Sequence, residues 1–259
     1  MIICENEEQM PRFFLSASNI SDGFVTVTGD DAFHISRSLR MRAGEHITVC
    51  DMQKIEYDCE LCEFGADFVR AKVISEKPSD TEPPYVIKLY QALPKSDKLD
   101  VIIQKSVESG AHEIIPFESE RCVARADTDI RKEEKKLERR QRIANEAAKQ
   151  CGRGILPIVR TPMKYREMLA DAIKSELVLF FYEGDDTVPL RRFLTERFSP
   201  GEIPKSISVI IGSEGGFSGS EVDAARAAGA SICGLGRRIL RCETAPGFAL
   251  ACLCYNFEL

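Results

Sequence analysis

The sequence predicts an α/β protein in which a small N-terminal β-barrel precedes a largely parallel sheet flanked by helices. Beyond residue 85, short apolar runs alternate with helix-length amphipathic segments, which is the chain order of a parallel sheet with helical crossovers. Before residue 77, the apolar runs are short, alternate with polar residues and are typical of a small barrel. The chain therefore divides into two domains of different architecture.

The stretch KPSDTEPPY (77–85) separates these two patterns. It carries three prolines and no periodic apolar residues, which is typical of a linker. We therefore expect an N-terminal domain over residues 1–78, a linker over 79–84 and a C-terminal domain over 85–259.

Four strands and one short helix are expected in the N-terminal domain. The strands are the alternating runs at 23–28, 45–51, 55–63 and 67–75, and the helix covers 31–40. His34, Arg37, Arg40 and Arg42 lie in a stretch without a carboxylate, inside an otherwise acidic domain. Arginines spaced in this way near a helix end gather on one side, so they form a candidate phosphate-docking patch. A solvated surface is the alternative.

Five strands and six helices are expected in the C-terminal domain. The strands are the apolar runs at 85–91, 113–117, 177–182, 207–211 and 231–235, and the helices cover 96–109, 131–151, 165–173, 188–197, 219–228 and 245–254. In the first helix, apolar residues from Leu99 to Val107 share one face and Gly110 ends the helix. Lys105 and Glu108 on this helix are expected to form a structural ion pair.

Two glycine-containing loops follow the last two strands. Ile207 to Ile211 is a β-branched-rich run of the kind that is buried on both faces of a sheet, and Gly212 ends it. Ser218 and Glu221 form a capping box that opens the next helix. Gly236 to Arg241 makes a basic loop after the last strand. Parallel strands place such loops at one edge of the sheet, so the two loops predict a ligand pocket built from backbone.

The glycine spacing and one acidic residue restrict which class of ligand the pocket can bind. The spacing matches neither the dinucleotide motif nor the P-loop, and Glu214 inside the first loop would repel a phosphate. A neutral or cationic ligand with adenosine-like edges fits better. The alternative is that Gly212, Gly215 and Gly216 only make a tight turn from strand to helix.

Composition argues against a membrane-spanning protein and against a metal site. No stretch approaches the roughly 20 apolar residues that span a bilayer, and the start, MIICENEEQM, lacks the basic region of a signal peptide, so we expect a cytoplasmic protein. Cys59 and Cys62 have metal-ligand spacing, but no second pair or suitably spaced histidine accompanies them. On a strand they would face opposite ways, so we expect reduced thiols and no metal.

The net charge of −6 argues weakly against a nucleic-acid partner, but local charge matters more. Residues 131–142 carry seven basic and three acidic side chains on one long helix, whose exposed face is either solubilising or in contact with RNA. Arg153, in the GRG segment after this helix, is placed to approach a ligand.

The strings IGSEGGFSGSEV (211–222) and LGRRILRCETAP (235–246) resemble the paired signatures of the RsmE-type ribosomal RNA methyltransferases, which belong to the SPOUT superfamily. Two positions depart from these signatures, because Ser213 replaces the usual Pro and Cys242 replaces the usual Thr. Four segments upstream are also similar to the family and lie in the same order as in that family, at 10–15, 34–45, 93–122 and 146–157.

This resemblance implies a PUA-like, RNA-binding N-terminal barrel and a SPOUT domain with a trefoil knot, a rare exception to the usual connection rules. It also implies a homodimer and S-adenosylmethionine as cofactor, bound by loops at 182–185, 211–217 and 235–241. The candidate cofactor-binding residues are Gly212, Glu214, Gly215, Leu235, Gly236, Ile239, Leu240 and Thr244. The candidate RNA-binding residues are Arg12, His34, Arg37, Arg40, Arg42 and Arg153.

The implied reaction is methyl transfer to N3 of a uridine in 16S ribosomal RNA, with the RNA or the small ribosomal subunit as partner. The N3 proton must leave, so either a base removes it or a cation stabilises the uridine anion. Arg241 is the candidate cation, and binding of RNA phosphate is its alternative role. Glu214 and Glu243 are candidate proton acceptors. Alternatively, Glu214 holds its loop through backbone amides, and Glu243 with Thr244 caps the last helix.

Two other functions are compatible with the sequence, a nonenzymatic RNA-binding or ribosome-assembly factor and a SPOUT methyltransferase that acts on another RNA. The first needs the basic patches but not the cofactor loops. A nucleotide-phosphate enzyme is disfavoured, because Phe217 and Ser218 follow the glycines where a phosphate-binding Lys would stand.

Overall fold

The computed structural model describes residues 10–184 and 186–259, which divide into two compact units. The first unit contains the described chain up to Glu82 together with Ala148–Leu156, and the second contains Pro83–Ala147 and Pro157–Leu259. Residues 148–156, which the sequence predicts to lie in the C-terminal domain, are thus part of the first unit. Side-chain hydrogen bonds to Glu82, given below, are what place them there.

The first unit is built on a six-stranded sheet with the order β1-β4-β5-β6-β3-β2. The strands are β1 (Arg12–Phe14), β2 (Ile20–Ser21), β3 (Phe24–Thr28), β4 (His46–Cys50), β5 (Ile55–Phe64) and β6 (Phe68–Pro78). β1 pairs parallel with β4, and the other neighbours are antiparallel. The four predicted strands are confirmed, whereas β1 and β2 are too short to show periodicity. Val25 and Val27 alternate with less buried neighbours, so one face of the sheet forms the core.

The helix of the first unit differs from its prediction. A 3-10 turn (Ala17–Asn19) precedes it, and α1 (Gly29–Phe33) continues directly into a π-helix (His34–Ser38), so the helix predicted over 31–40 ends early. Arg40 has a φ of +54°, a left-handed conformation that no helix continues through. Only Arg37 of the three arginines therefore lies on the helix, and Arg40 and Arg42 follow it in the turn before β4. This corrects the expectation that helical spacing gathers them on one side.

The second unit contains a parallel sheet with the order β10-β8-β7-β13-β11-β14-β12, and β9 pairs with β8. Its strands are β7 (Val86–Ala92), β8 (Glu113–Glu118), β9 (Ile158–Val159), β10 (Met163–Lys164), β11 (Leu177–Phe181), β12 (Val188–Pro189), β13 (Ser206–Ile211) and β14 (Ser231–Gly234). The five predicted strands are confirmed. β11 is buried at every position, as expected for a parallel sheet covered on both faces.

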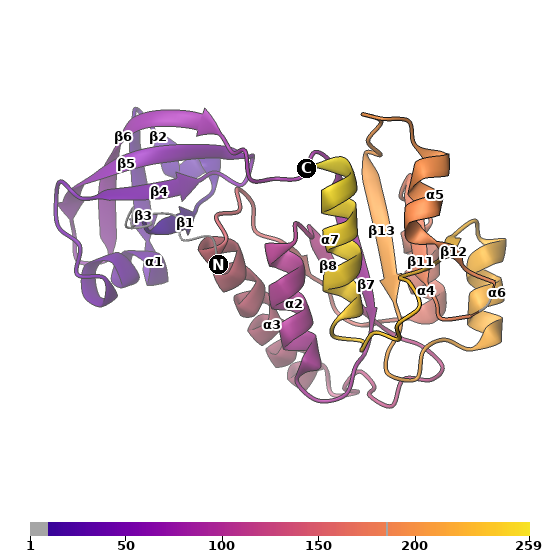
Figure 1. Cartoon of the computed structure of the whole chain (residues 1–259). Coiled ribbons are helices and arrows are strands. Elements are labelled where there is room, and N and C mark those ends of the chain that lie inside the picture. The colour runs from indigo at the N-terminus through magenta and orange to yellow at the C-terminus, as the bar shows by residue number, and fades with distance from the viewer. Residues whose placement is uncertain (1–9, 185) are drawn as a thin grey trace. The chain divides into compact units, whose positions relative to one another are not determined.

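Helices cover both faces of this sheet, with α2, α3 and α7 on one side and α4, α5 and α6 on the other (Figure 1). They are α2 (Lys98–Glu108), α3 (Ile130–Gln150), α4 (Tyr165–Ala172), α5 (Leu190–Arg197), α6 (Gly219–Ala227) and α7 (Ala245–Phe257). α5 begins later than predicted because Val188 and Pro189 pair with β14. The expected ion pair between Lys105 and Glu108 is confirmed at 2.9 Å. The trefoil knot stays a prediction.

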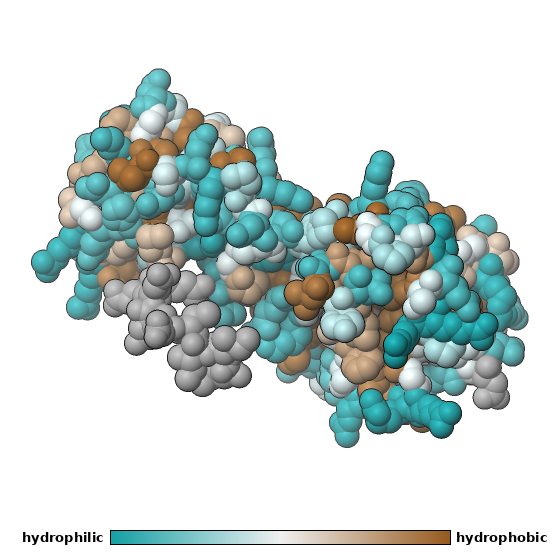
Figure 2. All heavy atoms as spheres, turned by 45° about the horizontal axis from the view of Figure 1, so that its top comes forward, coloured by the Kyte–Doolittle hydropathy of each residue, from teal (hydrophilic) through white to brown (hydrophobic). Residues whose placement is uncertain are grey.

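Hydrophilic side chains dominate the face of the molecule in Figure 2, with apolar residues scattered among them. Across residues 10–184 and 186–259, no helix has both the length and the apolar character needed to cross a membrane. The same residues include no group of three or more His, Cys, Asp or Glu side chains placed to hold a metal ion. Cys59 is buried and Cys62 is exposed, as expected for two positions on opposite faces of a strand.

Candidate functional site

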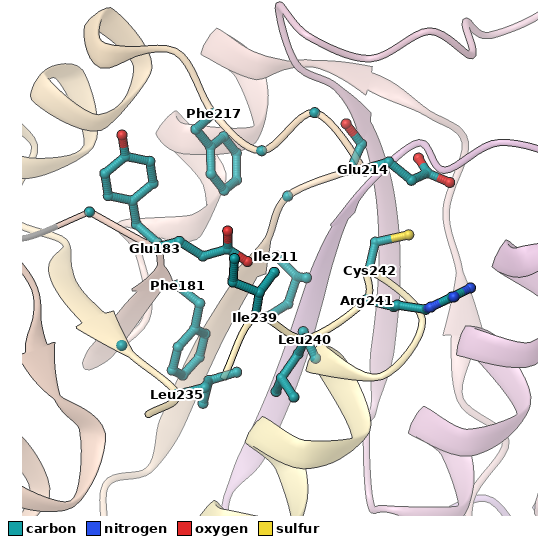
Figure 3. A pocket seen from close by; sticks show the side chains of 18 of the residues that line it. Phe181, Glu183, Ile211, Glu214, Phe217, Leu235, Ile239, Leu240, Arg241 and Cys242 are labelled. Carbon is teal, nitrogen blue, oxygen red and sulfur yellow. The ribbon is translucent and has the colours of Figure 1, made fainter. Parts of the chain in front are cut away.

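A cavity of about 850 Å³ lies at the carboxyl ends of β11, β13 and β14 in the second unit (Figure 3). Its volume is in the range of small-molecule and cofactor sites. Seven of the eight candidate cofactor-binding residues line it, namely Gly212, Glu214, Gly215, Leu235, Gly236, Ile239 and Leu240. The segment after β11 also contributes, through Tyr182 to Gly184, whereas residue 185 lies outside the described residues.

The first glycine loop follows β13 and is held tightly against its surroundings. The Gly216 N–H donates to the Ser213 carbonyl at 3.0 Å, and the φ of +63° at Gly216 favours glycine there. A Cβ at Gly215 would lie 2.9 Å from the Arg121 carbonyl oxygen, so this position also excludes a side chain. The Gly212 carbonyl accepts from Gln91 Nε2 at 3.1 Å. The loop is therefore fixed before any ligand arrives.

Phe217 and the capping box anchor the end of this loop. The Phe217 ring is fully buried and its centroid lies 4.2 Å from that of Phe180 on β11. The predicted capping box is confirmed, because Ser218 Oγ accepts from the Glu221 N–H at 3.3 Å and Glu221 Oε2 accepts from the Ser218 N–H at 3.0 Å. Burial of an aromatic ring together with both cap bonds makes the far end of the loop rigid.

The second glycine loop, after β14, contributes apolar surface to the cavity. Gly236 has a φ of +104°, which bends the chain away from the strand. Leu235 and Leu240 are half-buried, and Ile239 is 82% exposed although it lines the cavity. Figure 3 shows these side chains on the same side of the pocket as Phe181, the last residue of β11, and Glu183. An exposed isoleucine over an open cavity is surface that a bound molecule can cover.

Lys98, at the start of α2, forms a charged cluster with two of the three candidate catalytic residues. Its Nζ lies 3.0 Å from Glu214 Oε1 and 3.1 Å from Glu243 Oε2. Glu214 also accepts from the Lys95 N–H at 3.2 Å, which agrees with its alternative role of holding the loop. Lys98 is not among the residues predicted from the sequence, although it stands in the family-like segment 93–122. Only the tertiary fold brings it to residues more than 100 positions away.

The cluster is fully ionised near neutral pH. Burial acts to raise the pKa of Glu214, but backbone N–H donors and Lys98 outweigh it, so this pKa falls below its ordinary value. A backbone hydrogen bond and Lys98 lower the pKa of Glu243. Glu214 and Glu243 in turn raise the pKa of Lys98. Both carboxylates are therefore weaker bases than ordinary glutamates.

The last two candidates, Arg241 and Thr244, stand at the margin of the cavity. Arg241 lines it, is exposed, and points away from the apolar side chains in Figure 3. Thr244 is not among the lining residues. It occupies the N-cap position of α7, as its alternative role requires, but makes no side-chain cap bond, and Glu243 contacts Lys98.

Two of the candidate RNA-binding arginines form ion pairs within the first unit, where Arg153 is buried and Arg12 is half-buried. Arg153 is 2% exposed, and its Nη2 lies 2.7 Å from Glu82 Oε2 while its Nε donates to Glu82 Oε1 at 2.8 Å. Arg12 Nη1 lies 2.8 Å from Glu56 Oε1 and donates to the Arg153 carbonyl at 3.2 Å. Ion pairing engages both side chains and burial encloses Arg153, so contact of either arginine with RNA stays a prediction. The glycines around Arg153 suggested an accessible loop that the fold closes.

The other four candidates for RNA binding, His34, Arg37, Arg40 and Arg42, are exposed. They keep the predicted character of a basic surface, although they do not lie on one helix.

The basic segment 131–142 of α3 is partly neutralised. Arg139 pairs with Asp100 at 2.7 Å, Arg140 with Glu133 at 3.0 Å and Lys136 with Asp127 at 3.2 Å. These pairs favour a solvated, self-neutralising face.

Residues 81–254 match the family described as the RNA methyltransferase domain, and residues 27–74 match the RNA methyltransferase PUA domain. These matches identify the class of the protein as an RNA methyltransferase with an N-terminal PUA domain. The two matches cover the two kinds of sheet found in the structure.

Relatives narrow the class to one family. Ribosomal RNA small subunit methyltransferase E of Bacillus subtilis is 35% identical over 257 residues, which cover 96% of this chain and 98% of that protein. The protein of the same name from Mesomycoplasma hyopneumoniae is 32% identical, with coverage of 93% and 97%. The crystal structure of the Neisseria gonorrhoeae protein of this name, bound to S-adenosylmethionine, is 32% identical, has a TM-score of 0.79, and gives coverage of 96% and 98%. The chain belongs to the family of the ribosomal RNA small subunit methyltransferase E.

Proposed function

We propose that this protein transfers a methyl group from S-adenosylmethionine to N3 of a uridine in small-subunit (16S) ribosomal RNA. The observation that carries the proposal is the cavity that the two glycine loops form beside the ends of β13 and β14. Membership of the family supports the reaction class, and the relative from Neisseria gonorrhoeae is bound to S-adenosylmethionine.

The residues around the cavity fit this cofactor. Glycine backbone in both loops lets the edges of an adenosine approach main-chain groups closely. Leu235, Ile239 and Leu240 provide apolar surface for its flat base. Glu183 lines the same cavity and suits a ligand with a positive sulfonium group, whereas the charge of Glu214 is paired with Lys98.

The chain's own residues mainly align the reactants and exclude water, because S-adenosylmethionine supplies an already activated methyl group when bound. Loops 211–217 and 235–240 hold the cofactor, largely through backbone and apolar contacts. Arg241 is exposed at the margin of the cavity, where its charge can meet a uridine base. There it stabilises the negative charge that forms as N3 loses its proton.

Glu214 and Glu243 hold the loops in this proposal and do not remove the proton. Lys98 contacts both carboxylates, and their pKa values are lowered, which makes each a poor proton acceptor. Of the three candidate catalytic residues, Arg241 is therefore the one that we assign to the uridine.

RNA binds to exposed cations in each unit. His34, Arg37, Arg40 and Arg42 provide them in the first unit, and Arg237 and Arg238 in the second loop provide them at the cavity. Local positive potential supports phosphate binding even though the whole chain carries a net charge of −6. The PUA match over residues 27–74 supports this use of the first unit.

Two measurements on the purified protein test the proposal. Calorimetry is expected to detect binding of S-adenosylmethionine, and labelled methyl groups are expected to pass to small-subunit RNA from cells that lack this protein. Binding of RNA without binding of the cofactor would favour a nonenzymatic assembly factor. Transfer to a different RNA alone would favour another SPOUT methyltransferase.

The protein is further proposed to act as a cytoplasmic homodimer. The resemblance to SPOUT proteins supports this assembly, with the cofactor site completed near the interface. Sedimentation equilibrium is expected to give twice the mass of the chain, and the mass of one chain would contradict the homodimer.

A further inference from the structure

Lys98 joins the two glycine loops that line the cavity. It is the first residue of α2, and its Nζ contacts Glu214 of the first loop and Glu243 at the end of the second. Both contacts link positions far apart in the sequence. The two loops follow different strands, β13 and β14, which are not neighbours in the sheet because β11 lies between them. Both strands pair with β11, so the sheet sets where each loop begins, and Lys98 contacts both loops beyond the ends of the strands.

The two carboxylates need this cation. Both lie within 3.1 Å of one nitrogen, so they are close enough to repel each other strongly without it. An ammonium group has three donors, which lets it serve two carboxylates at once. The side chains of Lys98, Glu214 and Glu243 are 31%, 29% and 23% exposed, so solvent screens this repulsion only in part.

We propose that Lys98 is a positioning residue that sets the spacing of the two cofactor loops by neutralising Glu214 and Glu243. This inference rests on the proposed function, because it concerns the loops that bind S-adenosylmethionine. Lys98 acts through the carboxylates and takes no part in the chemical step.

Lys98 is the cation in direct contact with both carboxylates, and other ionisable groups lie near the cluster. Cys242 Sγ lies 3.9 Å from Nζ, and burial raises the pKa of this thiol to about 12, so it is neutral. Arg121 and Arg241 line the same cavity. Asp97 and Asp100 flank Lys98 on its own chain segment, and both contact Arg139, at 3.8 Å and 2.7 Å.

Lys105 offers a matched control on the same helix. It pairs with Glu108 at 2.9 Å, but this pair lies within α2 and joins no loop. Replacing either lysine with methionine removes one charge and leaves an unbranched side chain that is one heavy atom shorter. Lys98→Met therefore removes the contacts to the two loops, whereas Lys105→Met removes only a contact within α2.

The first experiment measures the affinity of the full-length protein for S-adenosylmethionine by calorimetry. Lys98→Met is expected to weaken binding about tenfold, as the coupling of neighbouring charged groups suggests, whereas Lys105→Met leaves it unchanged. Lys98→Arg is expected to recover most of the loss. Equal affinities of Lys98→Met and the wild-type protein would overturn the inference. If the wild-type protein binds no S-adenosylmethionine, the proposed function fails instead.

A second readout separates charge neutralisation from simple loss of packing. Adding Glu243→Gln to Lys98→Met removes the repulsion, so the double variant is expected to bind S-adenosylmethionine more tightly than Lys98→Met alone. Weaker binding by the double variant would contradict the proposal.

Lowering the pH should have opposite effects on the affinity of the wild-type protein and of Lys98→Met for S-adenosylmethionine. Because the pKa values of Glu214 and Glu243 are lowered, the cluster is intact at neutral pH and is lost only as the pH falls through those lowered values. Wild-type affinity therefore weakens in acid. In Lys98→Met the carboxylates repel each other, so protonation between about pH 7 and about pH 5 is expected to strengthen binding. The same sign in both proteins would overturn the inference.

Hydrogen exchange without cofactor gives an independent check. Amides of residues 213–217 and 241–245 are expected to exchange faster in Lys98→Met than in Lys105→Met. Equal exchange in the two variants would show that Lys98 does not hold the loops.

Discussion

In each unit of this protein a cluster of opposite charges joins distant parts of the chain, and these two clusters, Arg153 with Glu82 and Lys98 with Glu214 and Glu243, differ in exposure. Arg153 and Glu82 in the first unit are 3% and 2% exposed. Lys98, Glu214 and Glu243 in the second unit are 23% to 31% exposed and border a cavity. The buried ion pair joins segments of the chain away from water. The partly exposed cluster joins the two loops beside the cavity.

The buried cluster is also the more completely bonded one. Glu82 Oε1 accepts from Arg153 Nε and from the N–H groups of Gly154 and Ile155, at 2.8, 2.9 and 3.3 Å. These bonds bring residues 148–156 into the first unit. Breaking a buried ion pair by removing one of its partners is more costly than removing one partner of an exposed pair.

The largest effect on stability is therefore expected from Glu82→Gln. It should lower the free energy of unfolding of the first unit by about 3–5 kcal/mol, because it breaks the buried ion pair between Arg153 and Glu82. Denaturant titration measures this loss. Calorimetry on the folded variant should give the wild-type affinity for S-adenosylmethionine. A loss below about 0.5 kcal/mol would mean that the buried pair does not differ from a surface pair.

Arg241→Ala tests the proposal that the Arg241 charge stabilises the uridine anion. Methyl transfer is expected to slow about 100-fold, because the residue stabilises charge only as the reaction proceeds. The dissociation constant for S-adenosylmethionine should stay unchanged, since Arg241 points away from the apolar side chains of the cavity. Single-turnover kinetics separate the two quantities. An unchanged rate with weaker RNA binding would assign Arg241 to a phosphate.

Replacing Arg37, Arg40 and Arg42 together with alanine tests the exposed arginines of the first unit against its buried ones. RNA binding should weaken, and the slope of log K against log salt should fall by about one for each phosphate that the variant no longer neutralises. Lys72→Ala, which removes one exposed charge from β6 of the same unit, is the control. A slope equal to that of the control would reject the patch.

The smallest effect is expected from Lys105→Met, whose ion pair joins only adjacent turns of α2. The free energy of unfolding should change by less than about 0.5 kcal/mol, because exposed pairs of this kind are screened by water. Thermal unfolding measures it. A loss as large as that of Glu82→Gln would remove the distinction between surface pairs and clusters that join distant segments.

Much of the fold could be predicted because local signals and tertiary structure agree. β13 is a β-branched run bounded by a glycine, and its burial on both faces follows from that composition. The glycines of both loops also predicted the cavity, since parallel strands deliver loops to one edge of the sheet. Thr244 was expected beside the cofactor but lies outside the lining, because it already occupies the start of α7.

The parts that could not be predicted depend on partners far away in the sequence. Lys98 acquires its role only when Glu214 and Glu243 reach it, and nothing in its own segment indicates this. The burial of Arg153 could not be predicted for the same reason, because its glycine neighbours suggest an open loop whereas it pairs with the distant Glu82. Charge pairs across the fold leave no periodic signal along the chain.

The measurement that tests the central claim most directly is mass spectrometry of nucleosides from small-subunit RNA. RNA from cells lacking this protein would be incubated with the purified protein and labelled S-adenosylmethionine, then digested. The predicted result is a single labelled product, N3-methyluridine. A label on another atom of the base or on the ribose, or no label despite cofactor binding, would contradict the proposed reaction.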